Sequence, residues 1–97
     1  MRIVWTPLAI DRASEEAAFI AQDKPEAAKR WLEQFFKVVD RLKVFPLSGE
    51  RLPELPSSEY RQVVYRSHRI VYRVDGDTVA ILTVRRFKRQ LDETELS

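Results

Sequence analysis

The sequence has 97 residues, a net charge of +2 and a hydrophobic content of 44%. This length suits one domain with a modest core, so we expect residues 1–97 to form a single domain. The absence of cysteine and the single histidine exclude a disulfide framework and a thiolate zinc site. We therefore expect no metal and no cofactor. The N-terminal stretch is too polar for a signal peptide, and no apolar run could span a membrane. We expect a cytoplasmic protein with no membrane partner.

The N-terminal part has the pattern of a short strand followed by a helix. Arg2–Trp5 is an apolar run with β-branched and aromatic residues, and Thr6 and Pro7 are a typical helix start. Small or apolar residues then recur every three or four positions until about Gln22, which predicts a helix that approaches a neighbour closely. These residues are Ala9, Ala13, Ala17 and Ile20.

A second helix is predicted to follow immediately. Asp23 and Glu26 have the spacing of a capping box, Pro25 suits the first turn, and Pro46 ends the pattern. Apolar residues recur between them at helical spacing, at Ala28, Trp31, Leu32, Phe35, Val38, Val39, Leu42 and Phe45. Such a face is more often core than a cofactor site. The short link makes the two helices an antiparallel hairpin.

The C-terminal part has the pattern of three consecutive strands after a loop at Pro46–Glu59. The strands are predicted at Tyr60–Arg66, His68–Val74 and Thr78–Val84, and an Asp-Gly turn joins the last two. The predicted fold is α+β, in the order β-α-α-β-β-β, with an antiparallel sheet and the helical hairpin packed on one face. The tail, residues 92–97, is a candidate for disorder.

Positive charge is concentrated on these strands. Between Tyr60 and Leu91 there are eight arginines and lysines but only two acids, Asp75 and Asp77. This asymmetry favours an acidic partner or nucleic acid, but a solvated sheet face would also explain it.

Strand alternation predicts which side chains share a face. We expect Ile70, Tyr72 and Val74 to pack under the helices, together with Ala80, Leu82 and Val84. The opposite face would then mix aliphatic residues with arginines, and we predict that it is an uncovered groove for a partner. Its predicted members are Val63, Tyr65, Arg69, Val71, Arg73, Val79 and Ile81.

Five stretches together resemble the RelE/ParE superfamily, the toxins of bacterial type II toxin–antitoxin modules. They are "VWTPLA", "FIAQDKPEAAKRW", "FPLSGERLPEL", "YRQVVYRSHRIVYRV" and "VAILTVRRFKR", in that order along nearly the whole chain. The resemblance implies that a cognate antitoxin wraps the toxin and covers the groove. The expected antitoxin is ParD-like, with a ribbon-helix-helix fold.

The superfamily contains two activities, and the resemblance leaves both open. RelE-like members are ribosome-dependent mRNA endoribonucleases, for which Glu54, Arg61, Arg69 and Arg85 would be the candidate catalytic residues. We expect Glu54 to pair with an arginine rather than to act as a general base. The stretch "RRFKR" has no histidine or tyrosine to close such a site, and the loop has no lysine. His68 is expected to be exposed and not catalytic.

ParE-like members poison DNA gyrase and are not known as hydrolases, and this reading is favoured here. Gyrase is then the expected target, and no catalytic residue and no direct sequence-specific binding of nucleic acid are expected. The basic segment at the end of the last strand would contact the target, through Arg85, Arg86, Phe87, Lys88 and Arg89. A third possibility is a relative that has lost toxicity and only binds a partner.

Overall fold

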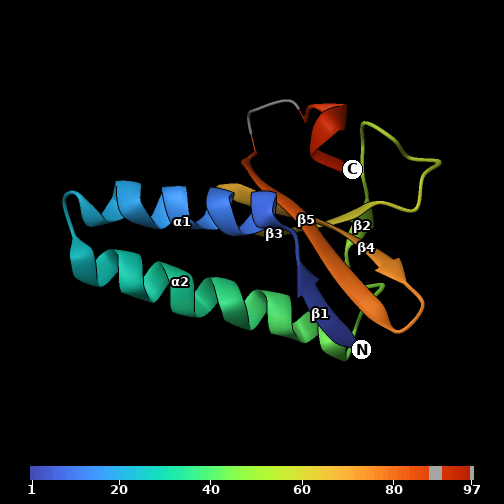
Figure 1. Cartoon of the computed structure of the whole chain (residues 1–97), viewed down its shortest axis with the longest axis horizontal. Coiled ribbons are helices and arrows are strands. Elements are labelled where there is room, and N and C mark those ends of the chain that lie inside the picture. Colours follow the sequence, from blue (N-terminus) through green and yellow to red (C-terminus); the bar gives the residue numbers. More distant parts are fainter. Residues whose placement is uncertain (88–90, 97) are drawn as a thin grey trace.

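A computed structural model describes residues 1–87 and 91–96 of the chain. Two antiparallel helices lie along one face of a sheet, and a short C-terminal helix lies beside the last strand (Figure 1). The helices are α1 (Pro7–Ala21) and α2 (Pro25–Asp40), with short 3₁₀ helices η1 (Arg41–Lys43) and η2 (Glu93–Leu96). The strands are β1 (Arg2–Trp5), β2 (Glu50–Arg51), β3 (Arg61–Tyr65), β4 (His68–Asp75) and β5 (Thr78–Arg86).

The sheet confirms the predicted α+β order and adds two features. Its strand order is β1-β5-β4-β3-β2, and β2 is a two-residue strand that the loop contributes. Strands β2 to β5 pair antiparallel, whereas β1 pairs parallel with β5. The sheet is therefore mixed. The prediction of an antiparallel sheet was wrong for β1, which runs parallel to β5. The helical hairpin and the other strands lie between these two strands in the sequence.

The start of α1 agrees with the prediction, but the start of α2 does not. The Thr6 hydroxyl accepts a hydrogen bond from the Ala9 N–H at 3.1 Å and donates one to the Leu82 carbonyl at 2.8 Å. At α2 the N-cap residue is Lys24, without a side-chain cap. The N–H groups of Asp23 and Lys24 both bond to the Ile20 carbonyl, which places Asp23 outside the cap position. The predicted capping box is absent for this reason.

The main core lies between the sheet and the helices. Ala9 and Ala13 let α1 pack closely, and α2 buries a stacked pair of rings, Trp31 and Phe35, with centroids 5.2 Å apart. Phe45 is exposed, contrary to its predicted place on the apolar face of α2. The α-helix ends at Asp40 and tightens into η1, so the helical spacing no longer applies beyond Leu42.

A β-bulge reverses the predicted faces of β5 up to Leu82, whereas Val84 lies on the helix side as predicted. Val71 is opposite Thr83 but Tyr72 is opposite Ile81, so Leu82 is an extra residue in the ladder. As a result Val79 and Ile81 belong to the helix-side core, while Leu82 packs on the outer face. The prediction that Val79 and Ile81 line the groove was wrong, and so was the placement of Ala80 and Leu82 under the helices.

Two residues of β3 were also assigned to the wrong face. Val63 lies directly opposite Ile70, and Tyr65 lies opposite His68. Directly opposed residues of an antiparallel pair share a face, so Val63 and Tyr65 follow Ile70 toward the helices. Tyr65 is buried there and its hydroxyl donates to the Trp31 carbonyl at 2.8 Å.

The outer face of the sheet is largely covered by the chain itself. Leu52, Val71, Leu82 and Leu96 form a second buried cluster, against which Leu55, Tyr60, Ala80 and Leu91 pack. Residues 92–96 pack on the sheet through η2, while residue 97 of the tail lies outside the described residues. The uncovered groove predicted from the sequence does not exist in this form. Among the described residues, no helix is both long and apolar enough to cross a membrane.

Candidate functional site

Glu54 and Arg69 form a tight pair on the outer face. Arg69 is buried in the middle of the β3–β4–β5 sheet, and its guanidinium donates to both oxygens of Glu54, one of them at 2.9 Å. A further bond of 3.2 Å reaches the side-chain oxygen of Gln62. The hydrogen bonds from Arg69 hold the pKa of the Glu54 carboxyl below its ordinary value. The expected pairing of Glu54 with an arginine is confirmed.

Arg85 lies directly opposite Arg69 in the sheet but has a different acidic partner. Its Nε is 3.3 Å from the carboxylate of Glu95 in η2. The Glu95 carboxylate is buried and also accepts from the Thr83 hydroxyl at 3.0 Å and from the Asp92 N–H at 3.1 Å. Glu95 therefore places the C-terminal segment on the sheet and neutralises Arg85.

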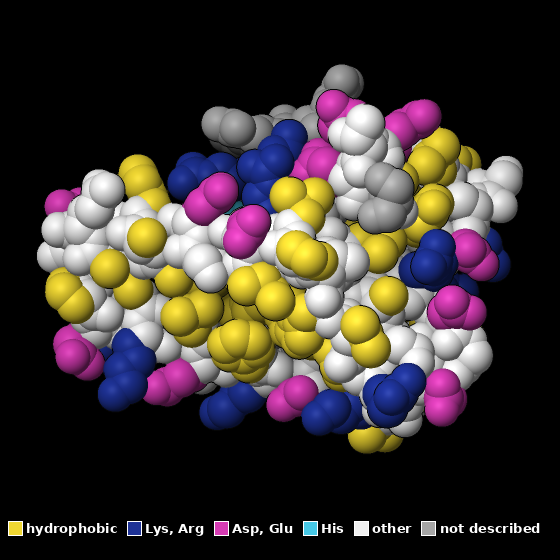
Figure 2. Space-filling view, viewed as in Figure 1, with side chains coloured by type: hydrophobic (Ala, Val, Ile, Leu, Met, Phe, Trp, Pro, Cys, Tyr) yellow, Lys and Arg dark blue, Asp and Glu magenta, His cyan; other side chains and the backbone are white. Residues whose placement is uncertain are grey.

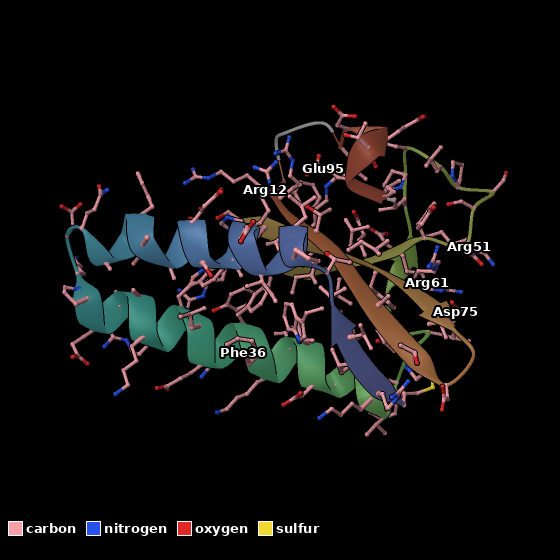
Figure 3. The ribbon with its side chains drawn as sticks, in the orientation of Figure 1. Arg12, Phe36, Arg51, Arg61, Asp75 and Glu95 are labelled. Atoms are coloured by element: carbon pink, nitrogen blue, oxygen red, sulfur yellow. The ribbon has the colours of Figure 1, made fainter. Side chains whose placement is uncertain are left out.

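Arg12 of α1 completes the surroundings of Glu95. Its guanidinium lies 3.7 Å from the Glu95 carboxylate, and Figure 3 shows these two labelled residues close together above α1. Neither Arg12 nor Glu95 was among the residues selected from the sequence. The available signal was the tail itself, where Leu91 and Leu96 flank the acids and are the residues that pack on the outer face.

Arg61 is separate from the other candidate catalytic residues. Its guanidinium donates to the Gly49 carbonyl at 2.8 Å, and it stabilises the loop after α2. The same loop is bound by Tyr72, whose hydroxyl accepts from the Gly49 N–H at 2.9 Å and donates to the Pro46 carbonyl at 2.8 Å. The structure therefore brings Glu54, Arg69 and Arg85 to one face and places Arg61 elsewhere.

His68 is buried, contrary to the prediction that it is exposed. Only 4% of the residue is accessible, because its ring packs edge-on against Trp31 with centroids 5.5 Å apart. Its Nε2 lies 3.3 Å from the carboxylate of Glu16 on α1. The strand start that was expected to expose His68 is covered by the helical hairpin.

The basic segment predicted to contact a target begins at the end of β5. Arg86 and Phe87 are exposed, whereas Arg85 is engaged with Glu95. The Arg86 guanidinium lies 3.4 Å from Glu16 and 5.5 Å from the centroid of the Phe19 ring. Lys88 and Arg89 lie outside the described residues. Of the predicted groove, only Arg69, Val71 and Arg73 are on the outer face, and Arg69 and Val71 are buried there.

A different surface is apolar and open to solvent. Hydrophobic side chains gather between α1 and α2 in the space-filling view (Figure 2). They line a hollow of about 350 Å³ made by Trp5, Ile10, Ala13, Ser14, Leu32 and Phe36. Ile10 of α1 and Phe36 of α2 are both exposed at its rim, and Phe36 is labelled in Figure 3. Large exposed apolar patches of this kind commonly mark a binding surface.

Comparison with known proteins places the chain among bacterial toxins. Residues 3–91 match the model of a family described as the ParE toxin of the type II toxin–antitoxin system parDE. A protein of Sinorhizobium fredii (strain NBRC 101917 / NGR234) named "Putative toxin Y4kP" is 37% identical over 83 residues, which cover 86% of this chain and 84% of that protein. A structure titled "Chromosomal ParDE TA system from P. aeruginosa" shares the fold with a TM-score of 0.77. It is 22% identical and covers 91% of this chain and 97% of the other.

Proposed function

Because the chain belongs to the ParE toxin family of the parDE type II toxin–antitoxin systems, we propose that it stops bacterial growth by inhibiting DNA gyrase. The action would take place in the cytoplasm, where gyrase and its DNA are found. A cognate antitoxin, ParD-like and with a ribbon-helix-helix domain, would hold the toxin inactive.

The observation that carries the proposal is the state of Glu54. A general base in RNA cleavage must take a proton from a 2′-hydroxyl, which favours a carboxylate with a raised pKa. Glu54 instead has a lowered pKa and is held by two hydrogen bonds from Arg69. The two other candidate arginines are also occupied, Arg61 by backbone carbonyls and Arg85 by Glu95. These contacts support a toxin that acts by binding, and disfavour the RelE-like alternative.

The first test measures what stops when the chain is expressed alone in bacteria. We expect protein synthesis to continue at first, followed by filamentation and a DNA-damage response. An immediate collapse of amino-acid incorporation would contradict gyrase inhibition and would favour the alternative function, an mRNA endoribonuclease. Normal growth despite accumulation of the folded chain would instead identify a relative that has lost toxicity.

The second test uses purified gyrase and a DNA supercoiling assay. Replacing Arg86 and Phe87 by alanine should abolish inhibition, because these are the exposed members of the basic segment. Arg85 is unsuitable for this test, since its loss would remove one of the two arginines that face the buried Glu95 carboxylate and could disturb the fold. The matched control is Arg30→Ala, an exposed arginine on α2, which should inhibit like the unmodified chain. Full inhibition by the double variant would exclude this segment as the gyrase contact.

The apolar hollow between α1 and α2 is our candidate for antitoxin binding. An amphipathic helix of the antitoxin would cover Ile10 and Phe36, which are otherwise exposed to water. Phe36→Asp should therefore weaken antitoxin binding in a calorimetric titration while gyrase inhibition persists. Val64→Asp, on the other side of the molecule and equally exposed, is the control that should leave antitoxin binding unchanged. If Val64→Asp weakened antitoxin binding and Phe36→Asp did not, the antitoxin interface would instead lie on the outer face of the sheet.

A further inference from the structure

Two exposed phenylalanines lie near the end of the sheet that contains the β3–β4 turn and the C-terminal end of β5. Phe19 of α1 and Phe87 after β5 are 60% and 55% exposed. The Arg86 guanidinium covers part of the Phe19 ring. The Phe87 N–H donates to the Ser67 carbonyl at 2.8 Å, which places Phe87 beside the turn that contains Arg66. We call these four residues, Phe19, Arg66, Arg86 and Phe87, the Phe19–Phe87 patch.

Arg66 has a backbone conformation that its own packing does not explain. Its φ of 54° is in the left-handed region, which is strained for a residue with a Cβ and usually selects glycine or asparagine. The side chain is exposed, and no carboxylate within residues 1–87 and 91–96 pairs with it. Its guanidinium lies 5.7 Å above the centroid of the Tyr65 ring. The Arg66 guanidinium is therefore held at an exposed turn, at a position where glycine would be less strained.

At this end of the sheet, the charged residues of the strands and of the β3–β4 turn are all arginines. Asp75 and Asp77 are the only acids between residues 60 and 91, and they lie at the β4–β5 turn, the opposite end of these strands. Figure 3 shows the labelled Asp75 on the opposite side of the view from the turn between α1 and α2. The acids of α1 that line the adjacent hollow are Glu15 and Glu16. Glu15 lies 3.9 Å from Arg12, and Glu16 is shared between His68 and Arg86. Arg86 is still 52% exposed on its side chain.

Exposed aromatic rings beside arginines are suited to nucleic acid with unpaired bases. Bases stack on aromatic rings in a sequence-tolerant way, and arginines bind the phosphates between them. A protein partner would usually bury such rings in an apolar surround. Here the adjacent hollow of about 170 Å³ is lined by charged groups from α1 and β5, including Arg12, Glu16 and Arg85. A regular duplex would hide the base faces that the two rings could contact.

We propose that the Phe19–Phe87 patch binds an unpaired nucleic-acid strand, with bases on Phe19 and Phe87 and phosphates on Arg66 and Arg86. This rests on the proposed function only for its biological role: a gyrase inhibitor could hold a DNA strand that the enzyme has opened. The binding itself is a property of the free chain. It is tested without gyrase.

The experiment is a fluorescence-anisotropy titration of the full chain with labelled short oligonucleotides. The probes are oligothymidylate, the matching oligouridylate and a blunt DNA duplex, each at low and at high salt. We expect single strands to bind more tightly than the duplex, and binding to weaken as salt rises. A preference for the DNA strand supports a role at gyrase, while a preference for RNA supports the same patch with an RNA-directed role.

Variants of the patch separate stacking from general charge attraction. Phe87→Ala and Phe19→Ala should each weaken oligothymidylate binding about tenfold. Arg66→Gly should weaken binding severalfold without loss of thermal stability, since glycine accepts the positive φ. The matched controls are Phe45→Ala and Arg30→Gln, an exposed phenylalanine and an exposed arginine outside the patch. Both should bind like the unmodified chain.

Three results would overturn the inference. One is equal binding of single strand and duplex, and another is unchanged binding after both phenylalanines are replaced. The third is no oligonucleotide binding at all. If the same variants then lost gyrase or antitoxin binding, the patch would be a protein interface. The outcome is independent of the proposed function. Gyrase inhibition without strand binding removes this inference alone, and strand binding without gyrase inhibition removes the proposed function alone.

Discussion

At the scale of single residues, the Glu54–Arg69 pair predicts a pH dependence of stability. The pKa of Glu54 is lowered in the fold by hydrogen bonds from Arg69, so the pair stabilises the fold above the ordinary value of 4.5. This contribution is lost as the pH falls through the lowered value. Glu54→Gln should cost about 1 kcal/mol near neutral pH, a modest figure because the Glu54 side chain is 35% exposed.

Chemical denaturation of the two proteins across a pH series checks this prediction. The free-energy difference between the unmodified chain and Glu54→Gln should shrink toward zero well below pH 4.5. Glu59→Gln, which changes an exposed loop acid, is the matched control variant and should have little effect on the free energy of unfolding. A difference that is constant with pH would mean that the pair does not stabilise the fold through the charge of Glu54.

Tyr72 makes a second prediction at this scale. Its buried hydroxyl bonds to Gly49 and Pro46, and burial raises its pKa. Tyr72→Phe should destabilise the fold by about 1–3 kcal/mol, because two backbone groups lose their partner. Gly49→Ala should also be harmful, since a Cβ there would lie 2.6 Å from the Gln62 carbonyl oxygen. Thermal unfolding measures both changes, and Tyr60→Phe, which lies on the outer face, serves as the comparison.

At the scale of elements, the docking of η2 depends on one carboxylate. Glu95→Ala would leave Arg12 and Arg85 facing a site without its anion, and should cost about 2–4 kcal/mol. Glu93→Ala changes an exposed acid on the same short helix and should have little effect. Urea denaturation of the two variants compares them directly. Equal stability of both would show that Leu96 and its apolar neighbours hold η2 without Glu95.

At the scale of the whole molecule, the sheet has a buried cluster on each face. β4 contributes Tyr72 to the helix-side cluster and Val71 to the outer cluster, so it should be the most protected element. We predict that amide hydrogen exchange is slowest in β4 and β5. Leu96→Ala should speed exchange in the loop at residues 52–60 while leaving α1 and α2 unchanged. Faster exchange in the helices as well would mean that the two clusters open together.

Local patterns in the sequence were sufficient for the order of the elements. Helical spacing identified the buried face of α2, Thr6 and Pro7 marked the start of α1, and the short turns set the β3–β4–β5 meander. These signals depend on neighbours a few residues apart, so they survive without knowledge of the fold. The same residues supported the resemblance to the toxin family.

Contacts between distant residues decided the rest. The extra residue at Leu82 changes the phase of β5, and alternation alone cannot reveal a bulge that arises from pairing with β4. The covering of the outer face by Leu96, the burial of His68 under Trp31 and the partners of Arg85 join segments far apart in the chain. The sequence by itself thus determined which elements form and which family the chain resembles. Only the tertiary structure decided which arginines are exposed, because ion pairing and burial depend on how those elements pack.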